Sequence, residues 1–338
     1  MSFVHLHLNT EYSLLYGECR VSDVVTRAAE RGFRALAITD RNALFGAVGF
    51  SLACRNAGVK PIIGCECFLE PKGIGSDSLR RLTSDDCSVL VLIVTNAAGY
   101  CNLSALLSLA HLRGAGVPCV DVDMLASHSE GLIALSGGPS GEIHRCVKMN
   151  DLSAAHKFAS DMKRIFGGRF YIELQRHGEV DGRSEESVII SLAHGLDIDI
   201  VATNGVLYTD KSGARTQRML DSIAKNTQLS YGDGDDSRYL KTDEEMESLF
   251  ADLPEAIINT EVISDSVDFD FEFGVLHLPS FQVPEESGCS SGPEYLRMRY
   301  EKGFAERFGE SDQETLAVYR ERGDRELEII NEVGFANS

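Results

Sequence analysis

The sequence is short of positive charge. Its 338 residues hold 32 Lys and Arg against 52 Asp and Glu, a formal net charge of −20. Because affinity for nucleic acids comes largely from neutralised phosphates, this balance excludes a free-standing protein that grips DNA by its surface charge. Any contact with DNA is expected to be indirect, through other polypeptide segments.

Long apolar runs and paired cysteines are also absent. No stretch of about 18 apolar residues occurs, so no membrane span is expected. The start, MSFVHLHLNTEYS, lacks a basic region followed by an apolar stretch, and we expect no secretion signal. Nine scattered cysteines without a C-x-x-C pair are typical of reduced thiols in a cytoplasmic protein. Cys65 and Cys67 share a strand face, but without a second pair at zinc spacing we interpret them as buried structural thiols.

The sequence does contain a regular alternation of apolar runs and helix-like segments. Hydrophobic residues make up 43% of the chain, enough for a large core. Seven β-type runs occur at residues 3–8, 34–38, 60–64, 88–95, 131–135, 169–174 and 199–203. Helix-like segments lie among them at residues 21–31, 43–57, 97–112, 151–166 and 183–194. Strands that alternate with helices predict βαβ units and a parallel sheet.

Seven such strands are compatible with an open doubly wound sheet or with a closed barrel. Polar residues at the carboxyl ends of the runs favour the barrel, because barrel enzymes gather their chemistry on that face. These residues are His7, Thr39, Asp40, Glu66, Ser136, Thr203 and Asn204. We therefore predict an α/β fold with a seven-stranded (β/α) barrel over residues 1–208.

The alternation stops near residue 205. Segments 210–226, 242–250 and 254–266 are expected to be helical, and we assign residues 209–275 as a helical completion of the barrel region. Residues 276–293 hold three prolines, four serines and two glycines, which indicates a linker. Residues 294–338 are expected to form two polar amphipathic helices that bury little by themselves.

Three strand-end segments carry most of the functional information. They are HLHLNTEYSLLYG at 5–17, ALAITDRNALFGA at 35–47 and PIIGCECF at 61–68. In the first, His5 and His7 share a strand face, a common start of a metal site. Together with GYCNL, GLIALSGG, FYIELQRHG and IVATN in the same order, these segments resemble the polymerase-and-histidinol-phosphatase (PHP) domain at the N-terminus of bacterial C-family DNA polymerases. The segments RYLKTDEEMESLFADLPEAIINT and ELEIINEVGFANS extend the resemblance over essentially the whole chain, and both the replicative and the error-prone branch of the family stay open.

The resemblance implies a PHP-type barrel whose carboxyl-terminal face holds two or three metal ions, Zn, Mn or Fe, through nine ligands. His7 and Glu66 match two of those nine positions. The other seven are occupied by Asn9, Tyr16, Arg41, Val89, Gly138, Gly205 and Leu207. Valine, leucine and glycine side chains cannot coordinate a metal, so we expect a remnant site without a cofactor and without a metal-activated water.

Arg41 replaces an expected metal-binding His beside Asp40. Its guanidinium is always charged and can bind a carboxylate, so one hypothesis is that Arg41 neutralises Glu66 or Asp40 in the barrel pocket. The alternative is an exposed arginine on a loop. His177 matches a His that is common at that strand end, and we interpret it as a core or rim histidine of the same pocket.

The resemblance implies a role in DNA replication or in error-prone repair synthesis. The palm motif Gly-Arg-Gly-Ser does not occur, so this chain alone is expected not to polymerise DNA. We expect a scaffold for the remainder of the polymerase (palm, thumb and fingers), with residues 294–338 starting the palm and a proofreading exonuclease subunit as a further partner. The rival interpretations are a metal-dependent phosphoesterase or 3′–5′ exonuclease that uses His7, Asp40, Glu66 and His177, and an inert fragment without a partner.

Overall fold

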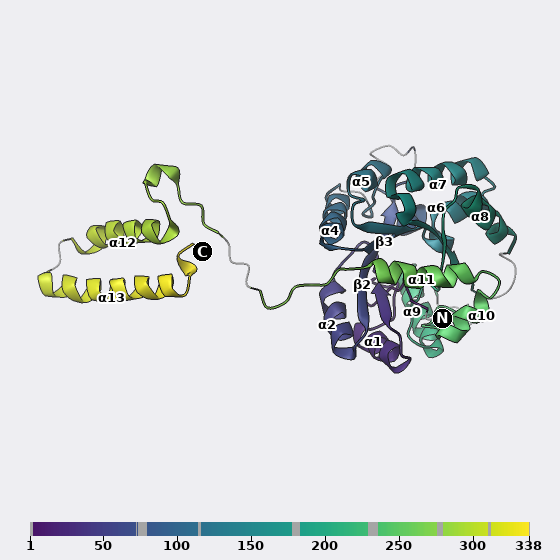
Figure 1. Ribbon diagram of the computed structural model, residues 1–338, viewed down its shortest axis with the longest axis horizontal. Coiled ribbons are helices and arrows are strands. Elements are labelled where there is room, and N and C mark those ends of the chain that lie inside the picture. Colours follow the sequence, from purple (N-terminus) through teal and green to yellow (C-terminus); the bar gives the residue numbers. More distant parts are fainter. Residues whose placement is uncertain are drawn as a thin grey trace. The chain divides into compact units, whose positions relative to one another are not determined.

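The computed structural model describes residues 3–71, 73, 80–113, 116–177, 183–228, 236–275, 280–309 and 312–337. The chain divides into two compact units, Met1–Phe271 and Glu272–Ser338, which are described separately (Figure 1). In the described part of the chain, we find no helix with the length and apolar character that crossing a membrane requires.

A six-stranded sheet with its strands in chain order forms the centre of the first unit. The strands are β1 (Ala35–Ile38), β2 (Lys60–Leu69), β3 (Ser88–Val94), β4 (Leu132–Leu135), β5 (Phe170–Gln175) and β6 (Ile200–Thr203). Every residue of β1, β3, β4 and β6 is buried, which explains why these strands are continuous apolar runs in the sequence. Six of the seven predicted runs are therefore strands, and β2 is longer than predicted.

The sheet is mixed, and the prediction of a wholly parallel sheet was wrong. Strand β3 runs antiparallel to both β2 and β4, whereas the other neighbours are parallel. A parallel pair requires a crossover connection, which is usually a helix. An antiparallel pair such as β2 and β3 needs no such crossover, and the described residues between these strands contain one short 3₁₀ turn, Ser84–Asp86.

The seventh predicted run, residues 3–8, contacts both outer strands of the sheet. His5 forms a bridge with Leu36 of β1, and Leu8 forms one with Val206, just beyond β6. The Ala37 N–H donates to the His5 carbonyl at 2.9 Å, and the Val206 N–H donates to the His7 carbonyl at 3.0 Å. The run is thus held between the two sheet edges by isolated bridges.

Helices enclose the sheet (Figure 1). They are α1 (Val21–Glu30), α2 (Ala47–Ala57), α4 (Ala97–Leu112), α5 (Val122–Ser127), α6 (Glu142–Lys148), α7 (Leu152–Phe166) and α8 (Arg183–Gly195). Helices α9 (Ala214–Ala224), α10 (Asp243–Leu249) and α11 (Pro254–Ser266) follow β6, and α11 packs against that strand. We did not predict α5 and α6, which are helices of six and seven residues.

Local sequence explains where several helices begin and end. At the start of α10, Thr242 and Glu245 form a capping box in which each side chain accepts a hydrogen bond from the other's backbone N–H. Pro254 opens α11 in the first turn, where its missing N–H costs nothing. Gly58 ends α2 in the left-handed conformation that glycine adopts without strain.

The described residues form three apolar clusters of buried side chains. Along β1, Leu36 and Ile38 belong to the largest cluster, whereas Ala35 and Ala37 belong to the second, which we call the inner apolar cluster. This alternation follows from the two-residue period of a strand, so these two clusters lie on opposite faces of the sheet. The third cluster is small and follows β6 in the chain.

The second unit is a pair of helices, α12 (Gly292–Phe308) and α13 (Gln313–Glu332). Gly323 of α13 faces Tyr300 of α12, because an added Cβ at Gly323 would collide with the Tyr300 hydroxyl. Among the described residues of this unit, three are buried, namely Gly292, Phe304 and Leu327. Three buried residues do not make a stable core, as we expected for these helices.

Candidate functional site

His7 lies at the centre of a buried cluster of charges. Its Nδ1 is 2.7 Å from Oε1 of Glu173 on β5, and its Nε2 is 3.0 Å from Oε2 of Glu66 on β2. All three residues are at most 3% exposed. Both ring nitrogens are thus hydrogen-bonded to carboxylates, an arrangement that suits a doubly protonated imidazolium.

Arg41 adds a second cation to this cluster. Its Nε donates to Oε1 of Glu66 at 2.5 Å, and its guanidinium carbon lies 3.0 Å from the centre of the Tyr16 ring. The Arg41 side chain is 22% exposed and that of Glu66 is 2% exposed, so the arginine separates the carboxylate from solvent. We refer to His7, Arg41, Glu66 and Glu173 as the charge network.

The pKa values of the charge network follow from its contacts. Burial alone would lower the pKa of His7, but the carboxylates of Glu173 and Glu66 outweigh it and raise the pKa to about 10. Burial alone would raise the pKa of Glu66, but Arg41 and His7 lower it to about 2. For Glu173, His7 likewise overcomes the effect of burial and lowers the pKa. At neutral pH the charge network therefore contains two carboxylates and two cations.

Glu173 is the member that sequence reasoning missed. Its Oε1 accepts hydrogen bonds from Thr203 Oγ1 at 2.5 Å and from Gln175 Nε2 at 2.8 Å, and its Oε2 accepts one from the Gly137 N–H at 3.1 Å. These donors come from β5, from the end of β6 and from the loop after β4. A carboxylate inside the apolar run FYIELQ was the available signal, because a fully buried acid needs a partner.

Asp40 is hydrogen-bonded to the neighbouring turn and is not a member of the charge network. Its carboxylate accepts hydrogen bonds from Thr10 N–H at 2.6 Å, Thr10 Oγ1 at 2.7 Å and Ser13 Oγ at 2.6 Å. Burial raises the pKa of Asp40 despite these bonds. Of the two carboxylates considered for Arg41, it is Glu66 that the guanidinium contacts.

The pattern His5-x-His7 does not produce a pair of neighbouring imidazoles. His5 Nε2 lies 2.9 Å from the Lys241 carbonyl oxygen, and its ring packs between Phe3 and Phe33. Burial lowers the pKa of His5 to about 4, so its ring is neutral where that of His7 is charged. The two rings of this pattern therefore lie in different environments.

At two positions where the family resemblance implied a metal ligand, this chain has a glycine. Side chains from other segments lie in the space beside these glycines. Gly138 and Gly205 have positive φ angles of 54° and 49°. A Cβ at Gly138 would lie 2.9 Å from Gln175 Nε2, and one at Gly205 would lie 2.7 Å from both Gln175 Oε1 and Arg238 Nη2. Arg238 is fixed there by donating to the Gly205 carbonyl at 2.9 Å. Gln175 and Arg238 thus occupy the space that ligand side chains would need.

The remaining candidate positions lie around the charge network or in the core. Tyr16 stacks on Arg41, and the Asn9 amide donates to Glu66 at 3.3 Å. His177 Nε2 lies 2.9 Å from Gln175 Oε1, so this rim histidine reaches the charge network through Gln175. Val89 packs in the inner apolar cluster, and Leu207 packs with Tyr208 and Tyr239.

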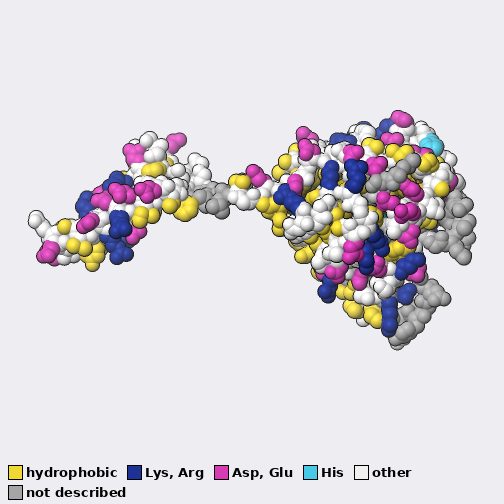
Figure 2. Space-filling model, turned by 60° about the horizontal axis from the view of Figure 1, so that its bottom comes forward, with side chains coloured by type: hydrophobic (Ala, Val, Ile, Leu, Met, Phe, Trp, Pro, Cys, Tyr) yellow, Lys and Arg dark blue, Asp and Glu magenta, His cyan; other side chains and the backbone are white. Residues whose placement is uncertain are grey.

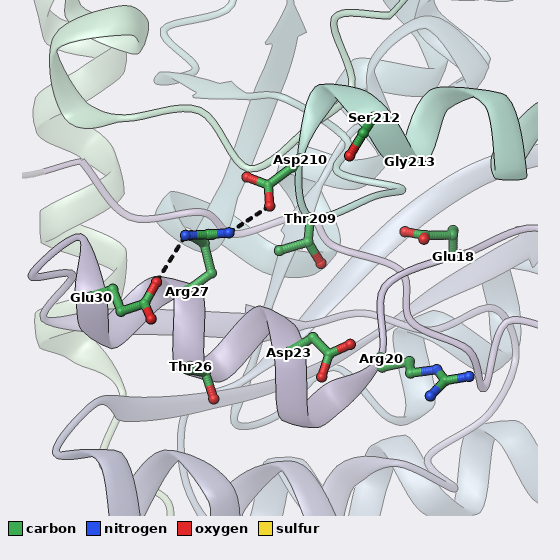
Figure 3. Close-up of a pocket in the computed structure, with 10 residues that line it drawn as sticks. All are labelled: Glu18, Arg20, Asp23, Thr26, Arg27, Glu30, Thr209, Asp210, Ser212 and Gly213. Atoms are coloured by element: carbon green, nitrogen blue, oxygen red, sulfur yellow. Dashed lines mark hydrogen bonds and ion pairs between the residues drawn. The ribbon is translucent and has the colours of Figure 1, made fainter.

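A separate cavity of about 440 Å³ lies beside α1 and the segment that leads into α9 (Figure 3). Arg27 lies in its wall and contacts Glu30 and Asp210, both at 2.8 Å, as Figure 3 shows. We refer to these three residues as the Arg27 cluster. Their side chains are 38–57% exposed, and none of them belongs to the charge network.

The surface carries mixed charge. On the face that Figure 2 shows, the Lys and Arg side chains drawn in colour are interspersed with Asp and Glu, and no continuous basic stripe is visible there. This distribution agrees with the acidic composition of the whole chain. Such a face lacks the electrostatic attraction that backbone phosphates require.

Comparison with protein families identifies this chain as a PHP domain. Residues 5–177 match the family model described as "PHP domain", and the chain belongs to this family. It is 34% identical over 353 residues to DNA polymerase III subunit alpha of Escherichia coli O6:H1, and 30% identical over 364 residues to that of Helicobacter pylori. The alignments cover 98% and 99% of this chain, which spans 29% of the length of each relative. The chain is therefore homologous to the N-terminal region of DNA polymerase III subunit alpha.

Solved structures show weaker likenesses. One structure, from Bifidobacterium adolescentis, is described as a proposed metal-dependent phosphoesterase. It is 11% identical to this chain, the match covers 73% of this chain and 96% of the other, and the TM-score is 0.42. An amidohydrolase from Chromobacterium violaceum is 13% identical, covers 54% of this chain and 89% of its own, and has a TM-score of 0.34. The family assignment rests on the PHP match.

Proposed function

We propose that this PHP domain is a structural module of a polymerase III alpha-type subunit, in which the charge network takes the place of metal ions. One observation carries the proposal: His7 and Arg41 neutralise Glu66 and Glu173 inside the site. A divalent cation would relieve the same repulsion between carboxylates. In this chain the cationic side chains of His7 and Arg41 relieve the repulsion between Glu66 and Glu173.

The residues present do not fit a di- or trinuclear metal centre. Both nitrogens of His7 are occupied by carboxylates, and Glu66 shares its oxygens among His7, Arg41 and Asn9. Within the described residues, no group of three or more His, Cys, Asp or Glu is arranged to hold a metal. An ion would also have to displace Arg41, whose positive charge opposes it. We therefore derive no metal-dependent chemistry for this chain.

We further propose that residues 3–8 act as the seventh strand of a PHP barrel. The bridges from His5 to β1 and from Leu8 to Val206 support this closure. On this view the barrel spans residues 1–208, and residues 209–275 complete it through α11, which covers β6. Residues 276–293 then form the linker that precedes the start of the palm region at 294–338.

The proposed partners are the remaining segments of the polymerase. The exposed apolar side chains of α13, among them Val318, Tyr319 and Ile329, support docking of this helix pair onto further polymerase segments. A proofreading exonuclease subunit is a second proposed partner of the module. On this proposal the module contacts DNA only indirectly. It works in the cytoplasm, in DNA replication.

Metal content tests the proposal directly. The chain is purified without chelator, equilibrated with Mn²⁺ or Zn²⁺ and passed through a desalting column, and its metal is measured by elemental mass spectrometry. We expect far less than one ion per chain and no hydrolysis of a chromogenic phosphate ester.

Matched variants make the test specific. His7→Ala and Glu66→Gln remove remnants of the family site, and His156→Ala removes an exposed histidine of α7 as a control. The proposal fails if the parent and the control hold at least one ion per chain, or hydrolyse the ester, while the two site variants do not. That result would establish the phosphoesterase or exonuclease alternative.

A further inference from the structure

Two cysteines from distant parts of the first unit meet at the end of β2. The sulfur atoms of Cys87 and Cys119 are 3.4 Å apart, although 32 residues separate them along the chain. Cys87 follows the short turn Ser84–Asp86 and precedes β3, and Cys119 precedes the residue that pairs with Leu69. Both are free thiols.

The two thiols differ in access to solvent. Cys119 is 2% exposed, whereas Cys87 is partly exposed. The hydrogen bond with Cys119 lowers the pKa of Cys87, and burial works against it. A partly exposed thiol whose pKa is lowered, in contact with a buried thiol, is the arrangement in which the first attacks and the second resolves.

We propose that Cys87 and Cys119 form a redox-sensitive dithiol, which a small-molecule disulfide such as oxidised glutathione converts to an intramolecular disulfide. Bond formation requires the sulfurs to approach from 3.4 Å to about 2.05 Å. The residues that must shift lie in connections outside the strands, which tolerate displacement better than a sheet interior does.

The reaction is a double thiol–disulfide exchange. The Cys87 thiolate attacks one sulfur of oxidised glutathione, breaks its S–S bond and releases the first glutathione, which takes up the proton of Cys87. The Cys119 thiol then loses its proton, attacks the Cys87 sulfur and releases the second glutathione. The protein loses two protons and two electrons in total, and one oxidised glutathione takes them up to become two reduced molecules.

The new disulfide would link the two segments that flank the end of β2. Leu69 pairs with Ser88, next to Cys87, and it also forms a bridge with Val120, next to Cys119. The Glu70 N–H donates to the Val120 carbonyl at 2.9 Å. Linking the two flanking segments restrains this end of the sheet and leaves the charge network untouched.

The test treats the full chain with glutathione buffers of increasing oxidised fraction. Free thiols are then alkylated in acid-quenched samples, and the peptides are mapped by mass spectrometry with and without a reductant. We expect one reductant-sensitive cross-linked peptide that contains Cys87 and Cys119. Slower hydrogen exchange at Glu70 and Val120 in the oxidised protein is the expected structural consequence. Absence of the cross-link, or a bond between other cysteines, overturns the proposal.

Three variants separate the roles of the two sulfurs. Cys119→Ser is expected to accumulate a mixed disulfide of glutathione on Cys87, because nothing resolves it. Cys87→Ser is expected to leave Cys119 unmodified, and Cys101→Ser, which removes an exposed thiol, is expected to form the cross-link as the parent does. Equal glutathione incorporation at Cys119 in the parent and in Cys87→Ser would contradict the assigned order of attack.

Discussion

The charge network and the Arg27 cluster contain the same kinds of groups in opposite surroundings. In the charge network Glu66 and Glu173 are almost fully buried, and in the Arg27 cluster all three side chains are at least 38% exposed. The N–O distances are similar, between 2.5 and 3.0 Å in both. Distance alone therefore says little about the role of an ion pair.

The degree of burial determines how much each cluster contributes to the free energy of unfolding. Water screens exposed ion pairs, and many of them add nothing measurable to stability. A buried carboxylate cannot be left without a partner, so removal of one cation leaves an expensive charge behind. Four experiments test this difference between the two clusters.

His7→Leu is expected to have the largest effect. The substitution leaves Glu66 and Glu173 buried without the imidazolium between them, and loss of one partner from a buried pair costs about 3–5 kcal/mol. Urea denaturation followed by circular dichroism measures the free energy of unfolding. His156→Leu on the exposed face of α7 is the matched control, and an equal loss in both variants would contradict the central role of His7.

Arg41→Ala is expected to cost about 3 kcal/mol, the lower end of the same range, because this side chain is 22% exposed. Arg41→Lys keeps the charge without the planar guanidinium that stacks on Tyr16, and should lie between Ala and the parent. The same urea titration applies. A loss within about 0.5 kcal/mol for Arg41→Ala, typical of an exposed surface residue, would refute neutralisation of Glu66.

The pH dependence of stability should show both titrations of the charge network. The pKa of His7 is about 10 in the folded chain against 6.5 for free His, so its contribution is complete below pH 6.5 and is lost as pH rises toward 10. The pKa of Glu66 is about 2 against 4.5, so its contribution is complete above pH 4.5 and is lost as pH falls toward 2. Urea midpoints from pH 2 to pH 10 measure the change. If His7→Leu loses stability above pH 6.5 as steeply as the parent, His7 is not the titrating group.

Arg27→Ala is expected to have the smallest effect. Its partners Glu30 and Asp210 remain hydrated when the guanidinium is removed, so no buried charge is created. We expect the urea midpoint to stay within the scatter of the parent, and added salt to remove any remaining difference. If Arg27→Ala lost as much stability as Arg41→Ala, burial would not explain how the two clusters differ in their contribution to stability.

The sequence was informative wherever a feature is local. Six of the seven apolar runs are strands, because an uninterrupted run of branched residues such as SVLVLIV already shows that both of its faces are buried. The direction of β3 was not predictable, since it depends on the connection from β2 and not on the residues of β3 itself. The run at residues 3–8 has strand composition, but its partners are set by β1 and by Val206, far away in sequence.

Three of the four members of the charge network were predictable from the sequence, but their pairing was not. His7 and Glu66 were recognisable as polar residues at strand ends, and Arg41 because it stands where the family resemblance implies a metal-binding His. The choice of Glu66 over Asp40 as the partner of Arg41 depends on Thr10 and Ser13, whose hydroxyl groups already satisfy Asp40. Glu173 escaped because its partners lie on three other segments, and no spacing within FYIELQ shows them.

The left-handed backbone at Gly138 and Gly205 limits which residues these two positions accept. A histidine or aspartate introduced at Gly205 would meet the side chains of Gln175 and Arg238 and would also need a backbone conformation that glycine tolerates best. The Gln175 amide and the Arg238 guanidinium end flexible side chains and can move aside, whereas the strain in the backbone stays. Installing a coordinating side chain at Gly205 therefore requires a new path of the main chain as well as a substitution.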